Sequence, residues 1–142
     1  MHADNALKIN AALAAINPEA ITDIIGLGHI DSMLKVRERL DEGAVVGMLG
    51  DRTLGEDIML PVNLLDDVAY MPVGPFRMAA LLRRPVIFMA GVYLGDNRYQ
   101  IYFEPVADFT NIPTGQRGAM VNTAVTRYAA LIDQHCRRAP YN

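Results

Sequence analysis

The spacing of apolar residues along the chain predicts alternating helices and strands. Apolar residues recur every three or four positions in residues 5–16, 29–43 and 115–138, as on the buried side of an amphipathic helix. A proline–glycine turn precedes a further apolar helix over residues 75–84. Continuous apolar runs over residues 44–49 and 86–94 predict strands that are buried on both faces, which is typical of a parallel sheet, and residues 20–28 predict a short buried strand that ends in glycines.

A hairpin is predicted near the middle of the chain. The turn signal Gly-Asp-Asn at residues 95–97 is followed by residues 98–106, in which Tyr99, Ile101 and Phe103 alternate with Gln100, Tyr102 and Glu104. A short strand is also predicted over residues 59–64. The order of elements therefore predicts a single α/β domain over residues 1–142, with a mainly parallel sheet flanked by helices and an antiparallel edge hairpin. Because no strand precedes the first helix, we interpret the chain as the C-terminal part of a larger domain.

Composition narrows the possible functions. The 142 residues are 51% hydrophobic and 20% charged, with a net charge of -3. Domains that bind nucleic acid through bulk electrostatics are usually strongly basic, so no nucleic-acid partner is expected. The single cysteine, Cys136, excludes an internal disulfide and a cysteine-based zinc site. No run reaches the roughly 18 apolar residues of a membrane-spanning helix, and no cofactor or metal site is indicated.

The first candidate site follows the apolar run at residues 44–49. If that run is a central strand, Asp51 and Arg52 lie at its carboxyl end, where ligands bind in open α/β sheets. Asp51 could orient a base or accept a hydrogen bond from a substrate hydroxyl, and Arg52 could hold an anion. The alternative is that these two residues are solvated loop charges or a local ion pair.

The second candidate site is the start of the helix at residues 75–84. Gly74 fits the N-cap, and Pro75 fits the first helical position, where the absent N–H costs nothing. The free amides of Phe76 and Arg77 then favour an anion. A cation in the first turn is disfavoured by the helix dipole, so Arg77 predicts either a bound anion or an internal carboxylate such as Asp51. The alternative is a rigid turn with Arg77 in a structural ion pair.

The remaining reactive side chains are weaker candidates. His29 is interpreted as a loop residue, and His135 as a favourable charge at a helix C-terminus. His135 and Cys136 are helix neighbours and do not face each other, which argues against a catalytic pair. The arginine pairs at residues 83–84 and 137–138 either compensate helix dipoles or, if they share one surface, face anionic lipid headgroups.

Taken together, four segments resemble a known family. They read "VVGMLGDR", then "AYMPVGPFRMAALLRRPV", "YQIYFEP" and "RYAALIDQHCRRAPYN", and an earlier stretch fits "H...A.KIN..L..INP". In this order and spacing they are similar to the C-terminal half of bacterial lipid A biosynthesis acyltransferases of the lauroyl/myristoyl type, within the lysophospholipid acyltransferase superfamily.

This resemblance implies transfer of a fatty acyl group from acyl carrier protein or acyl-CoA to a membrane lipid precursor. It implies a peripheral enzyme at the cytoplasmic face of the inner membrane, with Arg52, Gly74, Pro75 and Arg77 binding the acceptor and Asp51 in support. The family's catalytic histidine has an acidic residue five positions later. No histidine of this chain does, because the residues at that distance are Leu7, Leu34 and Pro140.

Two departures limit what the resemblance implies. The family often has an aromatic–glycine pair where this chain reads "NLLDDV", and Asp66 and Asp67 there repel an acidic substrate. The resemblance also leaves open which lipid accepts the acyl group.

Two alternatives to part of an acyltransferase remain. One is a non-catalytic domain that binds anions or lipid headgroups, and the other is an inactive fragment that folds as a homodimer covering its exposed sheet edge.

Overall fold

The computed structural model describes residues 25–26, 30–53 and 57–142, which fall into two compact units, 1–46 and 47–142. Each unit is described by itself. The predicted helix at residues 5–16 and nearly all of the predicted strand at residues 20–28 lie outside the described residues.

In the first unit, helix α2 (Ile30–Asp41) confirms the predicted amphipathic helix. Val36 is buried on its inner face, while the neighbouring charged residues are exposed. The helix ends before Gly43, whose φ of 87° is readily adopted only by glycine. The Ser32 hydroxyl donates a hydrogen bond to the carbonyl oxygen of Gly26 and so anchors the preceding chain to the first turn.

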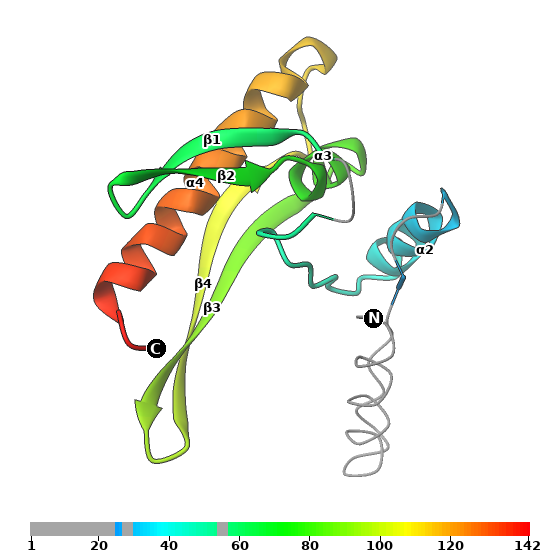
Figure 1. Cartoon of the computed structure of the whole chain (residues 1–142). Helices are drawn as coiled ribbons and strands as arrows, with labels where there is room; N and C mark the ends of the chain where they lie inside the picture. Colours follow the sequence, from blue (N-terminus) through cyan, green and yellow to red (C-terminus); the bar gives the residue numbers. More distant parts are fainter. Residues whose placement is uncertain (1–24, 27–29, 54–56) are drawn as a thin grey trace. The chain divides into compact units, whose positions relative to one another are not determined.

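The second unit contains two hairpins and two α-helices, shown in Figure 1. In chain order its elements are β1 (Met59–Leu64), β2 (Asp67–Pro72), α3 (Gly74–Leu81), β3 (Pro85–Gly95), β4 (Arg98–Asp108) and, after a 3₁₀ turn at Thr114–Gln116, α4 (Arg117–Arg138). The predicted strand at residues 59–64, the central hairpin and the two later helices are confirmed.

The predicted mainly parallel sheet is wrong. The described strands form two separate antiparallel sheets of two strands each, β1–β2 and β3–β4. The run at residues 44–49 is not a strand, and Val45 is 96% exposed. An apolar run forms a buried parallel strand only when neighbouring strands pair with it, and no described strand lies beside this one.

Both hairpins close through two-residue turns of left-handed backbone. Leu65 and Asp66 join β1 to β2, and Asp96 and Asn97 join β3 to β4, with φ between 51° and 67° at all four residues. This conformation suits the right-handed twist of the flanking strands. The "GDN" signal predicted the second turn. Strand β2 was not predicted, because Leu65 gives no glycine signal for the first turn.

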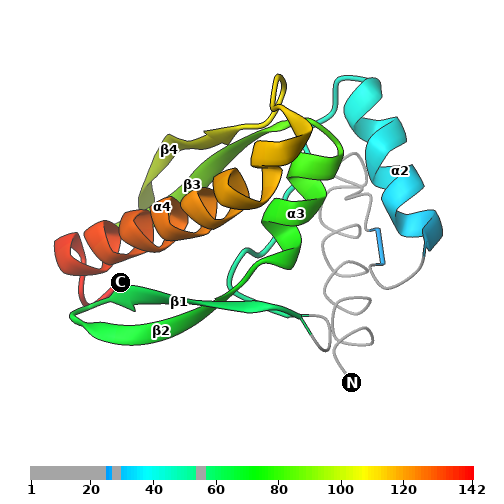
Figure 2. The ribbon, with the colours of Figure 1, turned by 90° about the horizontal axis from the view of Figure 1, so that it is seen from above.

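Helix α4 lies between the two hairpins (Figure 2) and contacts strands of both, together with α3. The main core forms where α4 meets β1, β2, α3 and the segment after β4. Its buried side chains are Val62, Met71, Val73, Phe76, Ala80, Phe109, Ile112, Val121, Ala124, Val125 and Ala129. Burial of this apolar surface is the main force that fixes both hairpins on the helix.

The hairpin β3–β4 has one buried and one exposed face. Phe88 packs toward α4 and is buried, whereas Ile87 and Met89 on either side of it are exposed. The prediction that residues 86–94 are buried on both faces is therefore wrong. The strand covers the core with one face only, since no second layer of the described residues covers the other.

Candidate functional site

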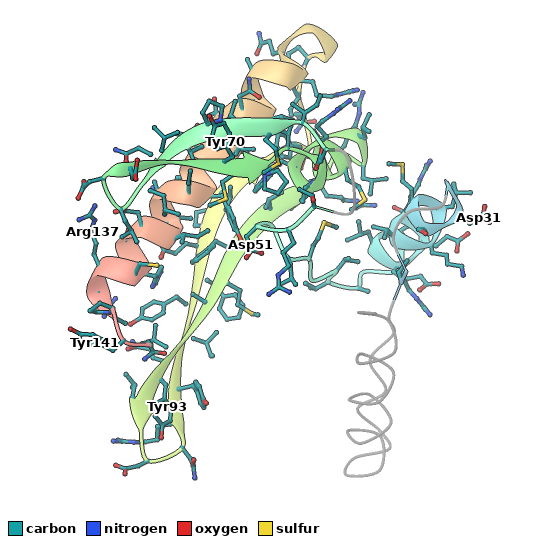
Figure 3. All side chains as sticks on the ribbon, viewed as in Figure 1. Asp31, Asp51, Tyr70, Tyr93, Arg137 and Tyr141 are labelled. Carbon is teal, nitrogen blue, oxygen red and sulfur yellow. The ribbon has the colours of Figure 1, made fainter. Side chains whose placement is uncertain are left out.

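Asp51 and Arg52 lie in the loop that follows residues 44–49, not at the end of a central strand. Their side chains are exposed, and Arg52 Nε lies 4.0 Å from Asp51 Oδ1. This geometry matches the local ion pair that the sequence left open as the alternative. At this distance and exposure the pair adds little stability, so both side chains remain available to a ligand. Figure 3 labels Asp51 on the loop.

Tyr128 of α4 connects this loop to the rest of the unit. A Cβ atom added to the buried Gly50 would lie 2.8 Å from Tyr128 Cζ, so only glycine permits this close approach. The Tyr128 ring also packs edge-on against Phe76 of α3 and Phe88 of β3, with centroids 5.4 Å and 5.7 Å away. The helical spacing over residues 115–138 predicted the helix, but it gave no signal for the contact of Tyr128 with Gly50.

The environment of Tyr128 disfavours ionisation of its hydroxyl. Burial raises the pKa of Tyr128 above its ordinary value, and the negative charge of Asp51 raises it further, while a backbone hydrogen bond at Gly50 opposes both effects. Tyr128 is thus held as a neutral phenol beside the candidate loop, which suits a hydrogen-bonding role more than that of a base.

The start of α3 is capped by a carboxylate of the chain itself. Asp57 Oδ2 accepts a hydrogen bond from the Gly74 N–H at 3.0 Å, and Asp57 Oδ1 accepts one from the Ile58 N–H at 2.8 Å. The N-cap residue is Val73, not Gly74 as predicted. A Cβ on Gly74 would lie too close to Asp57 Oδ2 unless the carboxylate moved, so glycine at this position lets Asp57 cap the helix. Asp57 therefore caps this helix start through the Gly74 N–H, and not through the amides of Phe76 and Arg77 at which the sequence predicted an anion.

Pro75 and Arg77 complete this turn. Pro75 lies in the first turn of α3, as predicted, and the Arg77 N–H donates to the Val73 carbonyl at 2.9 Å. The Arg77 side chain is exposed, and within the described residues no carboxylate forms an ion pair with it. The rigid turn of the alternative interpretation is present, while the part of the chain that the structure describes offers no ion-pair partner to Arg77.

The two candidate segments meet on one side chain. Gly50 of the loop and Phe76 of α3 both contact the Tyr128 ring. Among the described residues the charged partner of Asp51 is Arg52, and no ion pair joins Asp51 to Arg77. The loop and the start of α3 are therefore neighbours through Tyr128, each with one exposed arginine.

A histidine–carboxylate pair is present elsewhere in the unit. His135 Nε2 of α4 lies 2.8 Å from Glu104 Oε1 of β4, with side chains that are 8% and 27% exposed. The imidazole stacks on Phe88 at 5.4 Å and contacts Tyr102 at 4.8 Å. Residues 104 and 135 are far apart in the sequence, so no local pattern could have indicated the pair.

This pair is not positioned for proton transfer to a lipid. The Nδ1 atom of His135 is buried without a hydrogen-bond partner, and aromatic rings cover the imidazole. A catalytic base must come within hydrogen-bond distance of the proton that it removes, and a bulky acceptor cannot enter here. We conclude that the pair connects α4 to β4. The histidine was interpreted from the sequence only as a charge at a helix end.

The C-terminal arginine pair is engaged within the unit. Arg137 contacts Asp133 at 2.7 Å and Asp66 of the first hairpin turn at 2.9 Å, and Arg138 lies over the Tyr102 ring at 4.8 Å. The two hydrogen bonds from Arg137, and a third from the Leu65 N–H, hold the pKa of Asp133 below its usual value. These contacts support the helix-end interpretation of the pair over a free lipid-facing patch.

Other features add no second site. A hollow of about 490 Å³ is lined by Asn122, Thr123, Thr126, Arg127 and Ala130, all from α4, and includes no candidate residue. The described residues contain no group of side chains that could hold a metal ion. Among the described helices, none has the length and apolar character that crossing a bilayer requires.

Comparison with known proteins identifies the family. The sequence model of the bacterial lipid A biosynthesis acyltransferase family matches residues 19–141. The chain therefore belongs to this family of acyltransferases. No curated protein and no solved structure matches the chain.

Proposed function

We propose that this chain acts in transfer of a fatty acyl group from acyl carrier protein or acyl-CoA to a membrane lipid precursor, and that it supplies the part that binds the acceptor. The observation that carries this proposal is the family match over residues 19–141. The acceptor is a lipid A precursor, a lysophospholipid or another lipid with an anionic headgroup. The reaction takes place at the cytoplasmic face of the inner membrane.

The proposed acceptor site lies around Tyr128. Arg52 and Arg77 contribute exposed guanidinium groups from the loop and from α3, and both segments pack on the Tyr128 ring. Guanidinium groups match phosphate oxygens in geometry and charge. Gly74 and Pro75 fix the direction in which α3 begins, and Asp51 holds Arg52 near the loop.

A second candidate function is headgroup binding without turnover. It is favoured by the enclosure of His135, the one histidine of the described residues. The Nε2 atom of His135 is paired with Glu104 and its Nδ1 atom is buried, so neither nitrogen is open to a substrate. In the proposed acyltransferase, the catalytic base that removes the proton of the acceptor lipid is therefore not one of the described residues. This chain by itself is then expected to bind lipid and to transfer no acyl group.

The test is sedimentation with phosphatidylcholine vesicles that contain lysophosphatidylglycerol. Arg77→Ala and Arg52→Ala are each expected to weaken binding about tenfold, since a charge-assisted hydrogen bond is worth roughly 1.5–3 kcal/mol. Arg98→Ala is the matched control, because Arg98 is exposed and pairs with a nearby aspartate as Arg52 does, but lies at the turn of the β3–β4 hairpin and not in the proposed site. Absence of binding by the unaltered chain, or equal losses in all three variants, contradicts the proposed site.

A further inference from the structure

The outer face of the β3–β4 hairpin is apolar along its length. The strand register places Met89 opposite Phe103, Gly91 opposite Ile101, and Tyr93 opposite Tyr99. Along each strand, these side chains alternate with the side chains that face α4. No charged residue lies among the outward-facing ones. The large side chains of this face, 45–67% exposed, are Ile87, Met89, Tyr93, Tyr99, Ile101 and Phe103. We call these six residues, with Gly91, the outer face.

The outer face is large for a surface exposed to water. An aromatic side chain buries roughly 150–250 Å² when it is covered and an aliphatic one less, so six side chains that are about 60% exposed present on the order of 600 Å². The largest apolar patch on a typical monomer is about 300–600 Å². A standard protein interface buries about 800 Å² on each partner. The outer face is thus close to the area that a stable dimer needs.

We propose that the outer face binds the outer face of a second copy of this chain. A twofold axis brings one surface against itself, so a uniformly apolar sheet face without charges is self-complementary. Two such faces pack about 10 Å apart as in a β-sandwich. Gly91 leaves a shallow gap between Met89 and Tyr93, where its added Cβ would meet only Ile101 Cδ1 at 3.3 Å.

The edge of the hairpin favours this face-to-face arrangement over lateral extension of the sheet. The Asn142 side chain accepts a hydrogen bond from the Tyr93 N–H at 2.8 Å and donates one to the Tyr93 carbonyl at 2.7 Å. Both main-chain groups that Tyr93 offers at the edge of β3 are therefore occupied. A second copy adding a strand here would have to displace Asn142.

The charges near the outer face favour a protein over a lipid surface as its partner. Segments that dock on anionic membranes surround their apolar face with lysine and arginine. At the hairpin turn, Arg98 pairs with Asp96 at 3.6 Å, and Asp108 ends the other side of the sheet. Arg83 and Arg84 precede β3 at the same end as Asp108, so the charges at the two ends of the hairpin are mixed in sign. No lysine or arginine lies among the residues of the outer face itself.

Sedimentation equilibrium of the full chain tests the proposal, which does not depend on the proposed function. The unaltered chain is expected to have twice its mass of 15.6 kDa at micromolar concentration. Phe103→Glu should raise the dimer dissociation constant at least about tenfold. The matched control is Tyr70→Glu, because Tyr70 is a 64% exposed aromatic residue on β2 and Phe103 is 67% exposed on β4.

Circular dichroism shows whether each variant is folded, and both positions are exposed enough to accept glutamate. A monomeric unaltered chain, or equal dissociation constants for the two variants, overturns the proposal. A monomer that sediments with vesicles through Phe103 also overturns it and assigns the face to lipid. Lipid binding through Arg52 and Arg77, measured on the Phe103→Glu monomer, tests the proposed function separately.

Discussion

His135 Nε2 lies 2.8 Å from Glu104 Oε1, and this contact joins the last helix to strand β4. Removing one partner leaves the other without its hydrogen bond in a site that is mostly shielded from water. Removing one partner lowers the free energy of unfolding by more than the pair contributes to it, because the remaining polar group stays shielded from water without a hydrogen bond.

We therefore expect His135→Ala to lower the free energy of unfolding by about 2 kcal/mol. Glu104→Gln should cost less, because Glu104 is the more exposed partner and glutamine can still accept a hydrogen bond. Urea denaturation of both variants and of the double variant forms a thermodynamic cycle, with an expected coupling of about 1 kcal/mol. Strictly additive costs would show that the two side chains contribute independently.

Gly74→Ala should destabilise the chain because the added Cβ would displace the Asp57 carboxylate that caps α3. The added Cβ would lie too close to Asp57 Oδ2, so the carboxylate has to move away, and the hydrogen bond that caps the helix, worth about 1 kcal/mol, is lost. In an Asp57→Ala background, which itself loses a cap worth about 1 kcal/mol, the same change should cost much less. Thermal and urea unfolding measure both backgrounds.

Gly118→Ala is the matched control for this comparison. Gly118 also lies in the first turn of a helix, and nothing lies within 4 Å of its added Cβ. Alanine favours helix more than glycine does, so this variant should be neutral or slightly more stable. If Gly74→Ala is equally harmless in the unaltered chain, the capping role of Asp57 is refuted.

The Asp133 cluster predicts a loss of stability in acid. Its hydrogen bonds from Arg137 and Leu65 lower the pKa of Asp133 in the folded chain, so its contribution is present above the ordinary carboxyl pKa of about 4. That contribution disappears as the pH falls through the lowered value. Asp133→Asn and Arg137→Gln should each show a smaller drop in stability between pH 5 and pH 2.5, measured by urea unfolding. A drop as steep as that of the unaltered chain contradicts this assignment.

Tyr128 predicts a loss of stability in alkali. Since burial and the charge of Asp51 raise the pKa of Tyr128, the folded chain holds this proton more tightly than the unfolded chain does. Stability should therefore fall as the pH rises above about 10, the ordinary tyrosine pKa. Tyr128→Phe should remove part of this fall between pH 8 and pH 10.5, whereas Tyr141→Phe, at a fully exposed position, should not.

Local patterns were sufficient to predict several elements of the fold. Strand alternation and the "GDN" turn predicted the β3–β4 hairpin, and helical spacing predicted α2 and α4. The prediction failed where it equated an apolar run with burial on both faces. Burial depends on which other strands are present as neighbours, and the runs at residues 44–49 and 86–94 have exposed apolar residues for that reason.

The candidate site was predicted in part. Pro75 lies in the first turn of α3 as expected. Arg52 and Asp51 form the local ion pair that was one of the two alternatives for these residues. The carboxylate that caps α3 comes from Asp57, which is distant in the sequence and follows no capping pattern with Gly74. The contact of Tyr128 with Gly50 is likewise visible only after the chain has folded.

Asn142 fixes the chain that follows α4 to strand β3, through its two hydrogen bonds with the main chain of Tyr93. A fluorescent reporter attached at this residue would lie beside Tyr93. Its signal would then follow the opening of the hairpin separately from the melting of the helices. An affinity tag at the same place can loosen the strand that it is meant to leave untouched.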